Sequence, residues 1–225
     1  MRITYLGHSA VMIMHEGFSV LLDPFLSDNP LAPVAASTLD PDLILLTHGH
    51  HDHVGDALSI AKRTQAPVVA APELIALLEA EGLPAGKPLN IGGTVEWQGG
   101  RARMVQAVHS SSYGDRYAGE AAGYLIDWGG MRLYHAGDTA LFGDMKLYSS
   151  IQVDLAMLPI GGVYTMDARD ALDAVRWIQP ARVMPMHCNT FPQVQADPDR
   201  FVFEVNENTG CRGLVLSPGA SLELS

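Results

Sequence analysis

The sequence contains few cysteines and no long apolar run, and its N-terminal segment is not expected to be a secretion signal. Its two cysteines, Cys188 and Cys211, form no CxxC pair, so neither a disulfide framework nor a thiolate zinc site is indicated. No apolar run approaches the roughly 20 residues that a membrane-spanning helix requires. The N-terminal segment has a single basic residue, Arg2, and polar residues interrupt its apolar stretch, unlike a signal peptide. We therefore expect a cytoplasmic protein without a membrane partner.

Positive charge is also scarce. Lys and Arg total 14 against 25 Asp and Glu, which gives a formal net charge of -11. Because such a chain repels long polyanions, we expect no nucleic-acid partner. Bound divalent cations would offset part of the negative charge and attract small anions, so we expect a small-molecule substrate, phosphorylated or not. The sequence leaves the oligomeric state open and is compatible with a homo-oligomer.

The composition is that of a folded α/β protein. Hydrophobic residues make up 48% and charged residues 17%, which excludes a disordered chain, and the length suits one domain over residues 1–225. Short β-rich runs between Gly, Pro and Asp residues predict strands at Ile3–Leu6, Ala10–Met14, Val20–Leu22, Leu43–Thr47, Val68–Ala70, Val95–Gln98, Ala102–Val108, Ala122–Ile126, Arg132–Tyr134, Leu155–Leu158, Arg182–Met186 and Gly213–Leu216. Helices are predicted at Gly55–Arg63, Pro72–Glu81, Ala168–Ile178 and Pro198–Asn208. Early hairpins followed by alternating strands and helices favour stacked sheets with helices outside.

Four of the predicted strands run directly into a metal-ligand type of side chain. These side chains are His48, His109, His135 with Asp138 close behind it, and His187. Strands that deliver polar groups to one rim would bring several of them to one sheet edge.

The densest cluster of such side chains is His48-Gly49-His50-His51-Asp52-His53. A tight loop after a strand can direct these groups at two ions, and Gly49 would relieve crowding in that loop. Imidazole and carboxylate suit zinc, manganese or iron. Chance would produce this pattern on the order of once per thousand such chains. A structural zinc site usually saturates itself with four Cys or His ligands, whereas this larger set contains carboxylates and favours a catalytic centre.

These motifs resemble a known superfamily. The chain is similar to the metallo-β-lactamase superfamily over nearly its whole length, through His48-x-His50-x-Asp52-His53, His109, Gly137-Asp138-Thr139 and His187. It further resembles the branch of ascorbate-phosphate lactonase-like proteins and predicted metal-dependent hydrolases, through Gly7-His8-Ser9, Asp23-Pro24, Tyr134–Thr139 and Pro159–Met166.

The resemblance implies a four-layer αββα sandwich with two divalent metal ions at one edge of the sheets. It assigns His48, His50 and His109 to the first metal and Asp52, His53 and His187 to the second, with Asp138 as the bridge. Zinc is the favoured metal, with manganese or iron as alternatives. The expected activity is a metal-dependent hydrolase that uses a metal-bridging hydroxide to cleave a small ester, lactone or phosphoester. Diiron oxygen-reducing relatives carry Glu in place of the second motif histidine, which here is His50.

Two residues are candidates for catalytic roles beside the metals. Asp52 would orient the hydroxide and accept its proton. His8 would touch the substrate and protonate the leaving group, or it would be a hydrogen-bonded core residue. Asp23 is expected to orient a metal-bound imidazole through the other ring nitrogen, and His135 is expected to lie just behind the ligands.

The remaining residues are expected to have structural roles, or their roles are left open. We expect His51 not to bind metal, His15 to lie on the surface, and Cys188 to be a core thiol because neighbouring strand residues point to opposite faces. The segment 26–40 is either a flap over the pocket or an ordinary connection. Residues 110–114 offer hydroxyls to substrate or shape a turn.

Two alternative functions remain open. One is a phosphodiesterase that acts on phospholipid or nucleotide substrates. The other is a non-catalytic metal-binding sensor, against which the full set of seven ligand positions argues.

Overall fold

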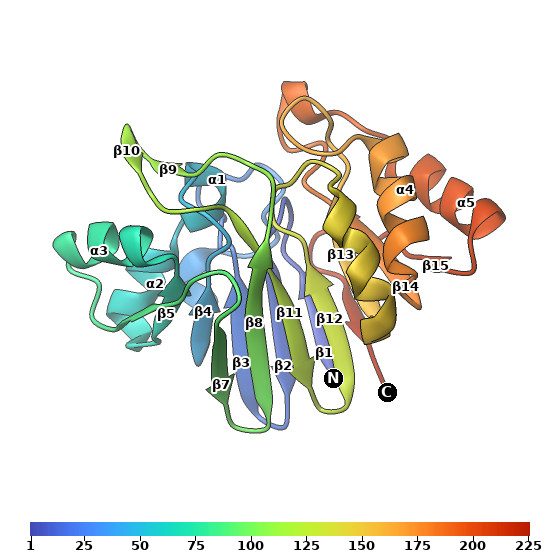
Figure 1. Ribbon diagram of the computed structural model, residues 1–225. Coiled ribbons are helices and arrows are strands. Elements are labelled where there is room, and N and C mark those ends of the chain that lie inside the picture. Colours follow the sequence, from blue (N-terminus) through green and yellow to red (C-terminus); the bar gives the residue numbers. More distant parts are fainter.

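Two seven-stranded sheets pack face to face in the computed structural model, which describes residues 1–225 (Figure 1). The first sheet has the order β16-β1-β2-β3-β4-β5-β6, and the second has the order β15-β14-β13-β12-β11-β8-β7. The strands of the first sheet are β1 (Arg2–Tyr5), β2 (Val11–His15), β3 (Phe18–Leu22), β4 (Leu43–Leu45), β5 (Val68–Ala70), β6 (Gly86–Pro88) and β16 (Ser221–Glu223). Those of the second are β7 (Thr94–Trp97), β8 (Gly100–Gln106), β11 (Ala122–Trp128), β12 (Met131–His135), β13 (Leu155–Pro159), β14 (Arg182–Met186) and β15 (Arg212–Gly213). A small separate hairpin joins β9 (Ser112–Tyr113) and β10 (Arg116–Tyr117).

Both sheets change from antiparallel to parallel pairing along their length. In the first sheet β1, β2 and β3 are antiparallel, and β3 to β6 are parallel. In the second, β7, β8, β11 and β12 are antiparallel, and β12 to β15 are parallel. Because a parallel connection needs a crossover that covers the sheet, helices follow the parallel strands.

The helices cover the two outer faces of the sandwich. Beside the first sheet lie α2 (Ala57–Thr64) and α3 (Pro72–Ala80), and beside the second lie α4 (Ala168–Ile178) and α5 (Pro198–Asn208), on opposite sides of Figure 1. A four-residue helix, α1 (His51–Val54), precedes α2. The resulting order of layers is the αββα sandwich that the resemblance implied. None of the helices has the length and apolar character that crossing a membrane requires.

Side chains of the first sheet alternate between two cores. In β3, Val20 and Leu22 pack in the core between the sheets, while Leu21 packs beneath α2 and α3. Successive strand residues point to opposite faces, so a strand covered on both sides carries a continuous apolar run. This explains why β3, β4 and β5 appear in the sequence as short runs of Val, Leu and Ile.

Most predicted elements are confirmed within a few residues, and β5, β14, α4 and α5 match to the residue. The strand predicted at Gly213–Leu216 is mostly wrong, because β15 comprises Arg212–Gly213 alone. After Leu214 the chain leaves the second sheet and crosses to the first, where the Gly219 amide donates to the Tyr5 carbonyl and β16 pairs with β1. The strands β6, β9, β10 and β16 and the helix α1 were not predicted.

The segment 26–40 is held down at several points, which favours an ordinary connection over a flap. Asp56 accepts hydrogen bonds from the Leu26 and Ser27 amides, at 3.0 and 2.8 Å. Asn29 is buried and donates to the Phe25 carbonyl. A short 3₁₀ turn at Ala36–Thr38 completes the segment.

Candidate metal centre

Side chains from both sheets converge at the end of the sandwich where α1 lies, in the upper part of Figure 1. The structure brings together all seven residues that the sequence marked as metal ligands, and also His8. They follow the ends of four strands or belong to α1 and the residues before it: His48 after β4, His109 after β8, Asp138 after β12, His187 after β14, and His50, Asp52 and His53 around α1. The predicted convergence on one rim is therefore observed.

Close packing shapes the loop between β4 and α1. A Cβ atom at Gly49 would lie 2.5 Å from the Ala118 side chain and 2.9 Å from the Ser112 carbonyl oxygen, so only glycine fits there. The Gly49 amide donates to the Ser111 hydroxyl. His50 is extended and α1 begins at His51, so the predicted loop continues into a short helix.

Three imidazoles form the first group, from His48, His50 and His109. His48 Nε2 lies 2.9 Å and His109 Nε2 lies 3.3 Å from His50 Nδ1. One nitrogen of each ring lies within 4.8 Å of the others, which is close enough for a single ion to contact all three.

A second group surrounds the buried Asp138 carboxylate. Its oxygens lie 3.3 Å from His53 Nε2, 3.0 Å from His187 Nε2 and 3.6 Å from His109 Nε2. Asp52 approaches the same nitrogen of His187, with Oδ2 3.9 Å from Nε2. Asp138 thus contacts histidines from both predicted ligand sets, as a bridging group would.

Several of these buried atoms lack a hydrogen-bond partner. They are His53 Nε2, Asp138 Oδ1, His187 Nδ1 and His187 Nε2. The His53 and Asp138 atoms are close but not in hydrogen-bond geometry. Because an unsatisfied buried polar atom is costly, the three that lie together at Asp138, which are His53 Nε2, His187 Nε2 and Asp138 Oδ1, fit cation binding. His187 Nδ1 is on the opposite edge of its ring and does not share that point.

The charges in this cluster depend strongly on one another. Burial and the nearby His53 charge lower the pKa of His48 well below its usual value, so its ring is neutral as a ligand must be. Burial opposes ionisation of Asp138, yet the charges of His187 and His53 hold its pKa well below the usual range. Burial alone would lower the pKa of His53, but Asp138 and Asp23 raise it well above normal. His53 therefore holds a proton that a bound cation would displace.

Asp23 supports His53 from behind, as the sequence predicted for this residue. Its Oδ2 accepts from His53 Nδ1 at 2.7 Å and from the Thr47 hydroxyl at 2.7 Å, and Oδ1 accepts from the Thr47 amide. All three residues are buried. The carboxylate fixes the proton of His53 on Nδ1 and leaves Nε2 directed at Asp138.

His8 is completely buried and does not line an open pocket. Its Nε2 lies 3.2 Å from Asp52 Oδ2 and its Nδ1 lies 2.9 Å from the Thr190 hydroxyl. Burial lowers the pKa of His8 to about 4. Burial opposes ionisation of Asp52, but the hydrogen bond from His8 lowers the pKa of that carboxyl below its usual range.

Thr190 is a site residue that the sequence did not indicate, whereas Ser111 lies in the segment 110–114, for which a substrate contact and a turn were both left open. Ser111 carries a weak signal, since it follows His109 by two positions, and its hydroxyl contacts the motif loop. Thr190 carries no signal, because its importance depends on His8, which is 182 residues away in the chain.

The other singled-out residues lie where the sequence indicated, with one exception. His51 is exposed and lies 3.1 Å from Asp28, outside the cluster. His135 is buried behind the cluster with Nε2 on the Ser9 carbonyl. Cys188 is a buried free thiol in the core between the sheets. His15, expected on the surface, is only partly exposed, at 22%, because its ring packs edge-on against Trp128.

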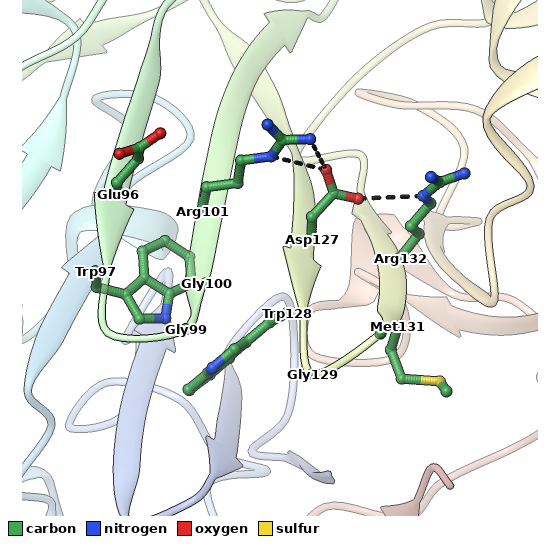
Figure 2. A pocket seen from close by; sticks show the side chains of 11 residues that line it. Glu96, Trp97, Gly99, Gly100, Arg101, Asp127, Trp128, Gly129, Met131 and Arg132 are labelled. Atoms are coloured by element: carbon green, nitrogen blue, oxygen red, sulfur yellow. Dashed lines mark hydrogen bonds and ion pairs between the residues drawn. The ribbon is translucent and has the colours of Figure 1, made fainter.

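A separate open hollow of about 450 Å³ lies at the opposite ends of the strands (Figure 2). It is formed by the β7–β8 and β11–β12 turns, whereas His109 follows the far end of β8. Figure 2 shows Asp127 between Arg101 and Arg132, with its oxygens 2.8 and 3.3 Å from their nitrogens. Asp127 and Glu96 balance the two arginines that line this hollow, and the hollow contains no cluster of metal-ligand side chains.

Comparison with known proteins identifies the family. A family model described as the beta-lactamase superfamily domain matches residues 2–187. A UPF0173 metal-dependent hydrolase of Thermoplasma acidophilum is 50% identical over 202 residues, 89% of each chain, and one of Natranaerobius thermophilus is 41% identical over 226 residues, 100% of each chain. The structure of Igni18, a metallo hydrolase from Ignicoccus hospitalis, superposes with a TM-score of 0.90 at 36% identity, covering 100% of this chain and 99% of that one. The chain therefore belongs to the metallo-β-lactamase superfamily, as a metal-dependent hydrolase.

Proposed function

We propose that residues 1–225 form one hydrolase domain that holds two divalent cations. His48, His50 and His109 would hold the first, Asp52, His53 and His187 the second, and Asp138 would bridge them. The observation that carries this proposal is that His53 Nε2, His187 Nε2 and Asp138 Oδ1 lie buried and close together without hydrogen-bond partners. Zinc is the first choice because imidazole and carboxylate are its common ligands, and manganese or iron are alternatives.

The cations would supply a water of lowered pKa and a Lewis acid for the substrate oxygen, which is the chemistry of hydrolysis at a carbonyl or phosphorus. The protein side chains have separate tasks. Asp138, buried and ionised, contributes negative charge between the two groups of histidines. Asp52 is the one carboxylate of the cluster with a partly exposed side chain, at 27%. It can therefore accept a proton from a group that enters from solvent, and we assign it the role of general base.

The substrate class that we propose is a small ester, lactone or phosphoester. The acidic composition disfavours a nucleic acid. His8 is too buried to protonate a leaving group directly, so we assign that proton to solvent.

The proposal is tested by metal analysis combined with a substrate panel. Purified protein should contain two equivalents of divalent metal and should hydrolyse an activated ester, a lactone or bis-p-nitrophenyl phosphate. A chelator should abolish the activity and added zinc or manganese should restore it. Turnover of the phosphodiester alone would replace the lactone assignment with a phosphodiesterase. Fully metallated protein that turns over none of the three would contradict the assignment of substrate class and favour a sensor.

A further inference from the structure

His8 adopts a backbone conformation that few residues with side chains adopt. Its φ is 56°, in the left-handed region where Cβ crowds the carbonyl. Two hydrogen bonds to its carbonyl oxygen hold it there, from the Tyr5 hydroxyl at 3.0 Å and from the His187 amide at 2.8 Å. Strained residues persist only where surrounding contacts determine them, and they concentrate at functional sites. The contact with His187 ties this strain to the candidate metal centre.

This backbone conformation places the ring of His8 between Asp52 and Thr190, where neighbouring side chains bury it completely. Phe25 and Phe191 pack edge-on against it, each with a ring centroid 5.6 Å away. Both ring nitrogens are in hydrogen-bond contact, one with Asp52 and the other with Thr190. The ring is therefore held at both ends.

The chemistry of the three groups sets the direction of both hydrogen bonds. An ionised carboxylate only accepts, so His8 Nε2 must donate to Asp52 Oδ2. In a neutral imidazole the other nitrogen then accepts, so the Thr190 hydroxyl donates to Nδ1 at 2.9 Å in preference to the Cys188 carbonyl, which lies 3.5 Å away. The proton of the threonine hydroxyl thereby determines which nitrogen of His8 faces Asp52 as a donor.

We propose that Thr190 and His8 are positioning residues that fix the orientation of the Asp52 carboxylate at the second cation position. The inference rests on the proposed function, because it assigns Asp52 to that cation. His8 occupies one oxygen of Asp52, so the carboxylate cannot rotate freely. Thr190 secures the tautomer of His8 that makes this possible. Neither residue touches the substrate.

The experiment uses Co²⁺ as a spectroscopic probe, so that no substrate is needed. Metal-free full-length protein is titrated with Co²⁺, and visible absorption and affinity are recorded for wild type, Thr190→Val, Thr190→Ala and Thr190→Ser. Thr190→Val has nearly the same shape without the hydroxyl, and Thr190→Ala covers the case in which valine does not fold. We expect both to bind the same number of Co²⁺ ions, to bind the second about 10- to 100-fold more weakly, and to show a changed absorption spectrum. Thr190→Ser should restore the wild-type spectrum.

Thr209→Val is the matched control, because the Thr209 hydroxyl also contacts backbone groups but lies at the end of α5. It should bind Co²⁺ as wild type does. The proposal is overturned if Thr190→Val and Thr190→Ala both keep the wild-type spectrum and affinity, or if Thr209→Val changes them equally. It is also overturned if His8→Ala loses a whole equivalent of Co²⁺, since His8 would then be a ligand. Wild-type protein that binds no Co²⁺ would instead contradict the proposed function itself.

Discussion

At the scale of single residues, Asp23 shows how a carboxylate can control a site without entering it. In Asp23→Asn, the amide oxygen can still accept from the Thr47 amide, and asparagine tolerates the left-handed φ of 42°. The amide nitrogen, however, would face the N–H of His53. His53 would then carry its proton on Nε2, the atom directed at Asp138.

We therefore expect Asp23→Asn to weaken the binding of Zn²⁺ about 10- to 100-fold with little change in folding. Competition with a chromophoric chelator measures this affinity. The matched control is Asp28→Asn, since Asp28 pairs with the exposed His51 outside the cluster. Equal affinities for the two variants would show that Asp23 does not direct the His53 tautomer.

The candidate ligands could be identified from the sequence because four of them lie within six positions and the others follow predicted strands. The residues that hold these candidate ligands in place could be identified from the sequence only in part. Asp23 directly follows the predicted strand Val20–Leu22, so its position at a strand end could be recognised in the sequence. Ser111 has only the weak signal of its place after His109, and Thr190 has none, because their contacts arise from segments that meet only after the two sheets pack.

Cys211 gives a prediction about pH that does not involve the metal centre. Burial raises the pKa of its thiol to about 12, compared with about 8.5 for an exposed thiol. A disulfide reagent at about pH 8 should therefore label it very slowly in native protein and rapidly in denaturant. Because the thiolate forms more readily in the unfolded chain, this group stabilises the fold fully below about pH 8.5, and the contribution is lost as pH rises.

The free energy of unfolding of wild type should accordingly fall as pH rises above about 8.5, and Cys211→Ala should show a shallower fall. Rapid labelling of native protein, or equal slopes for the two proteins, would contradict the assignment. Cys188, whose burial raises its pKa to about 11, contributes in the same direction.

At the scale of elements, the predictions succeeded where a local pattern determines the structure. The helix α4 begins after Asp167 and has an apolar face, and β14 is a run of apolar residues, so both were found to the residue. The strand β16 has three residues and no pattern, and it exists because β1 offers a free edge beside it. The helix α1 is a single turn within the His48–His53 cluster. Its residues are typical of metal ligands and show no helical pattern of apolar residues, so the helix was not predicted.

The N-cap residue of α4 allows a test of whether local sequence determines this helix. Asp167 accepts from the Arg169 and Asp170 amides at 2.9 and 2.8 Å, satisfying two amides that the helix leaves free. Asp167→Ala should lower the free energy of unfolding by about 1 kcal/mol, as measured by urea denaturation. Asp167→Asn should retain most of the stability, because asparagine caps almost equally well. If the two variants were equally destabilised, the loss would come from charge and not from capping.

At the scale of the whole molecule, the candidate metal centre joins the two halves of the sandwich. His48, His50, Asp52 and His53 extend from the first sheet, while His109, Asp138 and His187 extend from the second. Cations held between them would bind the folded chain more tightly than the unfolded one, in which the residues of the first sheet are far from those of the second. Metal binding should therefore stabilise the arrangement of the sheets as well as prepare the site for chemistry.

A bound cation at 100 times its dissociation constant adds about 2.7 kcal/mol of stability. For a chain of 225 residues this amounts to a rise of about 5–10 °C in the melting temperature. We expect wild type to show at least this difference between excess Zn²⁺ and excess chelator, by calorimetry. Asp138→Ala should lose most of the difference. His15→Ala should melt lower in both conditions, because it removes packing on Trp128, but should keep the full difference. If His15→Ala lost the metal-dependent difference, or Asp138→Ala kept it, the stabilisation would not arise from the cluster at the junction of the sheets.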